Sequence, residues 1–247
     1  MQRYFSKIKE NDIFTLSKED SYHIIRVMRM NKLDKVEVVD NQKEYICEII
    51  SLDQNVKCKI LEEIKEKEKT IPHVIIVQSL VKEQKMDYIL QKSTELGVDE
   101  IIPLNAERSI IKIDNKESKK IERWNKVLKE ASEQSKRNTI PVLNKIYSLK
   151  DLKDIDIKHK YICSVKEKEK TIKSILSKIS ISDTILFVIG PEGGLSDKEE
   201  EMLVESGFER ITLGSNVLRT ETASSFILSA IDYEFMRWFL CQSCLLR

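Results

Sequence analysis

The chain has 247 residues, of which 41% are hydrophobic and 34% are charged, and its 42 Lys and Arg residues balance 41 Asp and Glu residues. A disordered chain would be poorer in apolar residues and further from neutrality, so this composition excludes one. The five cysteines are too scattered for a disulfide scaffold and favour a reducing compartment. Because no apolar run reaches the roughly 18 residues of a membrane span, and none follows the N-terminus as in a signal peptide, we expect a cytoplasmic protein that does not cross a membrane.

The first 70 residues are predicted to form a small β-rich domain. Apolar and polar residues alternate as in strands at three places, and apolar residues recur at helical spacing at one place. The expected strands are 36–39, 44–50 and 56–61, with a turn at 40–43, and the expected helix is 18–30. A charged run, 62–69, then loses this pattern and precedes Pro72. We therefore divide the chain into domains 1–70 and 71–247.

The second domain is predicted to be an α/β domain, because strand and helix patterns alternate along it. This alternation is typical of a parallel sheet with helices on its faces. The expected strands are 73–80, 100–104, 161–165, 184–189 and 210–213, and the expected helices are 85–96, 118–137, 171–179, 196–207 and 221–239. Gly97 and Gly207 close two of these helices, where glycine is a common terminator, and Ser196-Asp197-Lys198-Glu199 is predicted to open the helix 196–207 as a capping box.

Glycine is scarce, at six residues, yet five of the six lie between 190 and 214. The expected strand 184–189 runs directly into Gly190-Pro191-Glu192-Gly193-Gly194-Leu195. Ligands of open α/β sheets bind at the carboxyl ends of strands, and glycine lets a ligand approach the backbone closely. The turn is a candidate binding loop, although a tight turn without a ligand has the same pattern. The chain contains neither G-x-G-x-x-G nor a Walker sequence, which argues against an ordinary dinucleotide site or P-loop.

A second strand ends in glycine about 20 residues later. Ile211-Thr212-Leu213-Gly214 is followed by the polar loop 215–222, which leads into the last helix. Helix capping by Thr220 or Thr222 accounts for part of this polarity, but it leaves Arg219 without a role. Two strand ends of this kind, close in sequence, are expected to form two walls of one pocket.

Residues 189–195 and 213–223 together resemble the SPOUT class of S-adenosylmethionine-dependent RNA methyltransferases. Within that class, the chain is similar to the ribosomal small-subunit RNA methyltransferase E family over almost its whole length. The further segments that carry the resemblance are 92–98, 101–104 with 107–109, and 130–137, together with His23-Ile24-Ile25-Arg26-Val27-Met28-Arg29 in the first domain. Two departures are Leu33-Asp34, where the family usually has Gly-Asp, and an apolar, cysteine-containing tail at 239–247.

The resemblance implies an α/β fold in which a C-terminal parallel-sheet domain of SPOUT type is tied in a trefoil knot. It also implies an N-terminal β-barrel domain of PUA type that binds RNA, and a homodimer. The implied reaction is methylation of N3 of a uridine in 16S rRNA or the small ribosomal subunit, with S-adenosylmethionine as cofactor and no metal. The implied cofactor-binding residues are Ile189, Gly190, Glu192, Gly193, Leu213, Gly214, Ser215 and Leu218, with Leu80 as a weaker candidate.

The expected chemistry assigns roles to charged residues near these loops. Uridine N3 must lose its proton, so a base or an anion-stabilising cation assists the reaction. Arg219 is the first catalytic candidate, and Glu221 either orients it or accepts the proton. For RNA phosphates the candidates are Arg26, Arg29, Arg108 and Arg137, since arginine binds phosphate bidentately. A structural salt bridge is an equally good explanation for Arg108, Arg137 and Arg219, and an ordinary solvated helix face would show the same charges as Arg26 and Arg29.

Two other functions remain open at this point. One is a SPOUT enzyme that methylates another RNA atom, such as the ribose 2′-oxygen, and the other is a non-enzymatic RNA-binding assembly factor. The pair Cys241-x-x-Cys244 has no second pair and no nearby histidine, so we expect it to hold no zinc.

Overall fold

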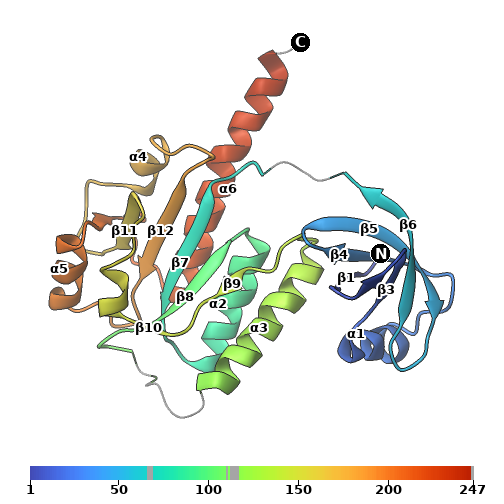
Figure 1. Ribbon diagram of the computed structural model, residues 1–247. Coiled ribbons are helices and arrows are strands. Elements are labelled where there is room, and N and C mark those ends of the chain that lie inside the picture. The colour runs from blue at the N-terminus through green and yellow to red at the C-terminus, as the bar shows by residue number, and fades with distance from the viewer. Residues whose placement is uncertain (66–68, 110, 112–116, 246–247) are drawn as a thin grey trace. The chain divides into compact units, whose positions relative to one another are not determined.

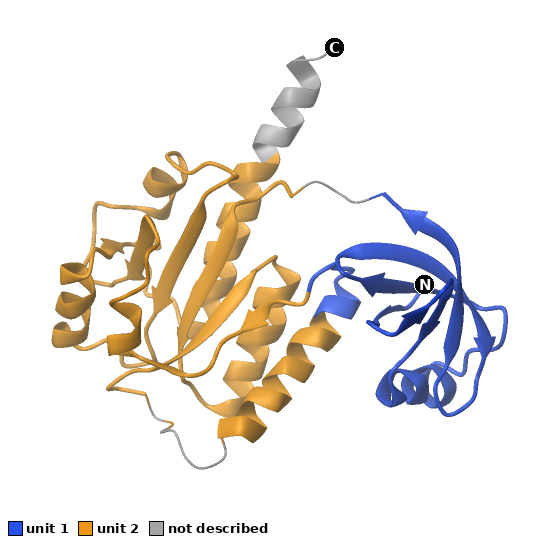
Figure 2. Cartoon of the chain, in the orientation of Figure 1, with its two compact units in different colours: residues 1–68, 132–139 blue, residues 69–131, 140–247 orange. Residues whose placement is uncertain are grey.

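The computed structural model describes residues 1–65, 69–109, 111 and 117–245, with side chains as far as residue 236. By its internal contacts the chain forms two compact units (Figure 2). Unit 1 contains residues 1–68 and 132–139, and unit 2 contains residues 69–131 and 140–247. The second segment of unit 1 has no counterpart in the sequence prediction, because nothing in its local pattern indicates a return to the first unit.

Unit 1 is a curled, open six-stranded sheet, which corresponds to half of a barrel (Figure 1). Its strand order is β1-β4-β5-β6-β3-β2, with β1 parallel to β4 and the other neighbours antiparallel. The elements are β1 (Arg3–Phe5), β2 (Lys9–Glu10), β3 (Ile13–Thr15), α1 (Lys18–Tyr22), η1 (His23–Val27), β4 (Lys35–Asp40), β5 (Lys43–Ser51) and β6 (Lys57–Ile64). Asn41 and Gln42 have φ of 47° and 70°, as a two-residue hairpin between β4 and β5 requires.

The predicted helix 18–30 is shorter in the structure. Ser17 caps α1 by accepting a hydrogen bond from the Asp20 amide. The helix then widens into the π-helical turn η1, and Arg29 has φ of 52°, a conformation that ends any right-handed helix. Strands β1, β2 and β3 were not predicted, because segments of two or three residues carry too little periodicity.

Unit 2 is an α/β domain built on a wholly parallel sheet (Figure 1). The strand order is β10-β8-β7-β12-β11-β13, and β9 pairs with β8. The strands are β7 (His73–Ser79), β8 (Glu100–Asn105), β9 (Val142–Leu143), β10 (Tyr147–Ser148), β11 (His159–Cys163), β12 (Thr184–Ile189) and β13 (Glu209–Ile211). The helices are α2 (Glu83–Glu95), α3 (Glu117–Gln134), η2 (Leu149–Leu152), α4 (Ile172–Leu176), α5 (Asp197–Glu205) and α6 (Thr220–Leu245).

The central strand β12 shows why both faces of this sheet are covered. Its side chains alternate between two apolar cores, because successive residues of a strand point to opposite faces. Ile185, Phe187 and Ile189 pack in the core shared with α2, α3, α4 and α6. Leu186 and Val188 pack in the core shared with η2 and α5. A strand buried on both faces is continuously apolar, as residues 185–189 are.

The elements predicted for unit 2 agree with the structure to within three residues at their ends, except that α6 continues to Leu245 instead of ending at residue 239. The two-residue strands β9 and β10 and the 3₁₀-helix η2 were not predicted. No helix among the described residues is both long and apolar enough to cross a membrane.

Candidate cofactor cleft

A cleft of about 650 Å³ opens at the carboxyl ends of β11, β12 and β13. This is the edge at which parallel α/β sheets bind ligands, and the volume is within the range of small-molecule sites. Three loops form its walls: 163–168 after β11, 189–195 after β12 and 212–220 after β13. Helix and loop residues outside these walls complete the lining: Lys85 of α2, Arg108 of the loop after β8, Asp197 and Glu200 of α5, and Ala223 of α6. The structure therefore brings together the two glycine-bearing strand ends that the sequence singled out.

Gly190 and Gly214 are required by the geometry of these walls. A Cβ added at Gly190 would lie 2.9 Å from the Leu195 amide nitrogen and 3.2 Å from backbone atoms of Gly194, because the loop folds back on itself. Gly214 has φ of +139°, which residues with a side chain rarely adopt, and a Cβ there would meet no atom within 4 Å. One glycine closes the first loop, and the other presents open backbone to the cleft.

The loop 189–195 is tied to the loop after β8 by a partly buried polar network. Ser196 and Glu199 form the predicted capping box at the start of α5. Glu199 Oε1 accepts a hydrogen bond of 2.7 Å from the Glu107 amide, and Ser196 Oγ donates one of 2.7 Å to Glu107 Oε2. The neighbouring Arg108 donates to the Gly193 carbonyl at 2.9 Å. Arg108, expected to contact RNA phosphate, thus has a structural bond to the cofactor loop.

Thr220 connects the two predicted walls. Its hydroxyl donates to the Gly190 carbonyl at 2.9 Å and accepts from Gln78 Nε2 at 3.0 Å. Gln78 is fully buried near the end of β7, and Thr220 is 6% exposed. These bonds join the carboxyl ends of β7 and β12 to the first residue of α6, a role that helix capping alone did not predict.

A chain of charges lies beside the cleft. Lys85 Nζ is 2.9 Å from Glu192 Oε1 and 3.6 Å from Glu221 Oε2, and Glu221 Oε1 is 4.0 Å from the Arg219 guanidinium. Burial raises the pKa of Glu192, but its hydrogen bond and charge interaction with Lys85 outweigh this, so the pKa lies below its ordinary value. The same hydrogen bond raises the pKa of Lys85. The Arg219 side chain is 81% exposed, whereas that of Glu221 is 17% exposed.

The third wall, residues 163–168, was missed by the sequence prediction. The Ser164 hydroxyl donates to the buried Glu200 carboxylate at 3.0 Å, and Arg210 Nε binds the same carboxylate at 2.9 Å. The local signal in the sequence was only a polar run after a predicted strand. This loop reaches the cleft because β11 lies between β12 and β13 in the sheet, and the sequence pattern does not show that strand order. Burial raises the pKa of the Cys163 thiol to about 12, which makes this cysteine a poor nucleophile.

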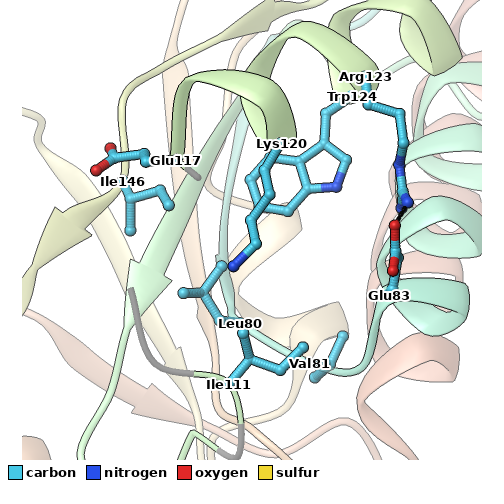
Figure 3. Close-up of a pocket in the computed structure, with 9 residues that line it drawn as sticks. All are labelled: Leu80, Val81, Glu83, Ile111, Glu117, Lys120, Arg123, Trp124 and Ile146. Atoms are coloured by element: carbon cyan, nitrogen blue, oxygen red, sulfur yellow. Dashed lines mark ion pairs between the residues drawn. The ribbon is translucent and has the colours of Figure 1, made fainter. Parts of the chain in front are cut away.

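Leu80, the weaker candidate in the predicted cofactor set, lies apart from the cleft. It is 3% exposed and lies, with Trp124 and Arg123, around a separate cavity of about 70 Å³ (Figure 3). That cavity is far smaller than a typical cofactor site. Leu80 is not among the described residues that line the cleft, because the chain leaves the sheet at β7 toward α2. The other predicted cofactor residues, Ile189, Gly190, Glu192, Gly193, Leu213, Gly214, Ser215 and Leu218, all line it.

The other arginines expected to bind RNA belong to unit 1. Arg26 and Arg29 are exposed at the end of η1. Arg137 is half-buried in the segment 132–139, where its guanidinium is 3.4 Å from Thr139 Oγ1. Among the described residues, no three His, Cys, Asp or Glu side chains are grouped to hold a metal ion. The side chains of Cys241 and Cys244 lie outside the described part.

The chain combines a parallel α/β unit, which has a cleft at its carboxyl edge, with a small curled β unit, and the family models that match it place it in the class of two-domain RNA methyltransferases. The family model of the RNA methyltransferase domain matches residues 67–232, and that of the RNA methyltransferase PUA domain matches residues 16–61. The ribosomal RNA small subunit methyltransferase E of Bacillus subtilis is 38% identical, over 95% of this chain and 97% of that protein. The chain belongs to the ribosomal RNA small subunit methyltransferase E family.

Two further relatives agree over nearly the full length of the chain. The enzyme of the same name from Aquifex aeolicus is 31% identical, over 94% of this chain and 99% of that protein. The crystal structure of the Neisseria gonorrhoeae ribosomal RNA small subunit methyltransferase E, bound to S-adenosyl methionine, is 30% identical with a TM-score of 0.84. It covers 94% of this chain and 97% of that chain.

Proposed function

We propose that this protein methylates N3 of a uridine in the 16S rRNA of the small ribosomal subunit, with S-adenosylmethionine as methyl donor. The observation that carries the proposal is the three-walled cleft, in which both glycine-bearing loops and Arg219 meet at one sheet edge. Relatives named as small-subunit rRNA methyltransferases, one of them solved with S-adenosyl methionine, support the substrate class and the cofactor.

The cleft fits a nucleoside cofactor by its shape and by its chemistry. Apolar side chains of Ile189, Leu213 and Leu218 line it, and exposed loop backbone supplies hydrogen-bonding groups. The open space at Gly214 lets a ligand approach that backbone. We assign cofactor binding to these residues with Gly190, Glu192, Gly193 and Ser215. When bound, S-adenosylmethionine supplies an electrophilic methyl group, and the protein supplies positioning.

Arg219 and Glu221 are proposed to act on the uridine. The exposed Arg219 guanidinium is free to approach a nucleotide and to stabilise negative charge on the carbonyl oxygens as the N3 proton leaves. Glu221, 4.0 Å away, orients this guanidinium or accepts the proton, directly or through water.

RNA binding is assigned to Arg26, Arg29, Arg108 and Arg137. The first two are exposed, and Arg108 has guanidinium N–H groups beyond the one bound to Gly193. Phosphate contacts of this kind position the RNA and weaken with added salt.

A homodimer is proposed through α6. Ile227, Ile231 and Phe235 of this helix are buried in the core of unit 2. Phe226 and Met236 are instead 39% and 52% exposed, which leaves apolar surface for a second copy. Sedimentation equilibrium is expected to give twice the 28.8 kDa mass of the chain, and a monomer would contradict this part of the proposal.

Two measurements separate the proposed function from its rivals. Calorimetric titration with S-adenosylmethionine is expected to show one site per chain, and no binding by the folded protein would favour a non-enzymatic RNA-binding factor. Mass analysis of rRNA nucleosides from a strain that lacks the gene is expected to show loss of 3-methyluridine. Loss of a ribose methyl group with uridine bases unchanged would instead identify a 2′-oxygen enzyme.

A further inference from the structure

Lys85 is the residue of α2 that reaches both of the predicted walls of the cleft. Its ammonium is 2.9 Å from Glu192 Oε1 in the loop after β12, and 3.6 Å from Glu221 Oε2 in the first turn of α6. It also lines the cleft itself. The cation thus lies between the proposed cofactor loop and the residue beside Arg219.

Glu221 depends on this cation because its carboxylate is poorly solvated. The side chain is 17% exposed, and Oε2 has no hydrogen-bond partner among the described residues. The charged groups that face it are Lys85 at 3.6 Å and Arg219 at 4.0 Å, with Glu192 on the far side of Lys85. Lys85 is therefore the nearer of the two cations that hold this carboxylate in place.

Glu192 is held by the same ammonium. Burial raises the pKa of Glu192, while the hydrogen bond and charge of Lys85, with a smaller contribution from Lys82, lower it further than burial raises it. The reciprocal hydrogen bond raises the pKa of Lys85, which favours the charged ammonium.

We propose that Lys85 is a positioning residue for methyl transfer: it fixes Glu192 at the cofactor loop and gives Glu221 the cation that keeps it facing Arg219. This inference rests on the proposed function, since the reaction gives Arg219 and Glu221 their roles. A surface ion pair without this role would contribute little to any measured property, and that contrast makes the proposal testable.

The test compares Lys85→Met with Lys85→Arg and with a matched control, Lys69→Met. Lys69 Nζ is 3.0 Å from Asp99 Oδ1 at the opposite, amino-terminal edge of the same sheet, where Asp99 also binds the Val74 amide. Lys85→Met is expected to lower kcat about tenfold or more and, because Glu192 loses its partner, to weaken the calorimetric Kd for S-adenosylmethionine several-fold. Lys85→Arg is expected to recover most of kcat, and Lys69→Met to keep it.

A second readout does not depend on catalysis. The pKa of Glu192, followed by carbon-13 NMR of its carboxyl, is expected to rise in Lys85→Met, because burial then acts without the cation of Lys85.

An unchanged kcat and an unchanged Glu192 pKa in Lys85→Met would overturn the proposal, as would an equal loss of kcat in Lys69→Met. Failure of the wild-type protein to transfer methyl would instead refute the proposed function, and the Glu192 titration would still decide whether Lys85 holds this loop.

Discussion

Single side chains at the cleft separate into those that hold the loops and those that are free to meet a substrate. Thr220 and Gln78 are buried and hydrogen-bonded, whereas Arg219, the next residue to Thr220, is 81% exposed. Two adjacent residues therefore differ in role: Thr220 holds the loops together, and Arg219 is available to a substrate. The sequence indicated that this loop was unusual, but it did not show which polar residue was structural.

Arg219→Ala is predicted to abolish most methyl transfer while the fold is retained. The side chain has one acidic neighbour, Glu221, at 4.0 Å, so its loss should change the free energy of unfolding by no more than about 0.5 kcal/mol. Loss of charge stabilisation in the reaction should lower kcat about 10²- to 10³-fold. Thermal melts and a single-turnover methyl-transfer assay measure the two effects, and full activity in the variant would remove Arg219 from the mechanism.

Thr220→Val is predicted to act in the opposite way, through stability and cofactor affinity. It leaves the Gly190 carbonyl and Gln78 Nε2 without their partner, at a cost of about 1–3 kcal/mol in unfolding free energy. The same substitution at the exposed Thr222 is the control and should cost less than about 0.5 kcal/mol. Urea unfolding and calorimetry check this pair, and equal behaviour of the two variants would contradict it.

At the level of elements, local pattern was sufficient where each element is long and periodic. Strand β12 was predicted at its observed bounds, and the capping box of α5 is present as expected. The third wall of the cleft was not predicted, because it depends on the order in which parallel strands pair. That order is set by packing between residues far apart in sequence. The exclusion of Leu80 from the cleft has the same cause.

Ser196→Ala tests how the capped helix α5 supports the cofactor loop. It should remove the N-cap, at a cost of about 1 kcal/mol, and it should also free Glu107, whose neighbour Arg108 binds the Gly193 carbonyl. We therefore expect a several-fold weaker Kd for S-adenosylmethionine. Ser17→Ala removes the N-cap of α1 in unit 1 and should cost similar stability without changing that Kd. If both variants bind the cofactor as the wild type does, the network does not support the loop.

At the scale of the whole molecule, the chain passes from unit 1 to unit 2, returns to unit 1 and then enters unit 2 again. The sequence analysis predicted a single boundary, between residues 70 and 71. Residues 132–139 belong to unit 1, where the Arg3 guanidinium donates to the Lys136 carbonyl at 2.7 Å and to Asn138 Oδ1 at 2.6 Å. The same side chain, 3% exposed, pairs with Glu37 and Glu44. The trefoil knot stays a prediction from resemblance. The close contacts at Gly190 come from its own loop and supply no argument for threading.

Arg3→Met is predicted to destabilise unit 1 by about 3–5 kcal/mol, because it removes the cation that pairs with the shielded Glu44 and one of the two cations that pair with the shielded Glu37. The exposed pair Lys43–Glu63 supplies the control, and Lys43→Met should cost less than about 1 kcal/mol in unfolding free energy.

The Arg3→Met penalty should also depend on pH. Burial raises the pKa of Glu37, but hydrogen bonds from Lys136 and Arg3 lower it overall. Its contribution to stability is thus present above the unfolded pKa and is lost as pH falls through the folded value. Urea unfolding at neutral and acid pH should show the Arg3→Met penalty shrinking in acid, and a penalty independent of pH would contradict this.

The central claim is that this chain transfers a methyl group to N3 of a uridine in small-subunit rRNA. The most direct measurement incubates the protein with methyl-labelled S-adenosylmethionine and small-subunit particles from cells that lack the modification, and then identifies the labelled nucleoside by mass spectrometry. The account predicts labelled 3-methyluridine from the wild-type protein and almost none from Arg219→Ala. Label in a ribose or in any other base, or no label from a protein that binds the cofactor, would contradict it.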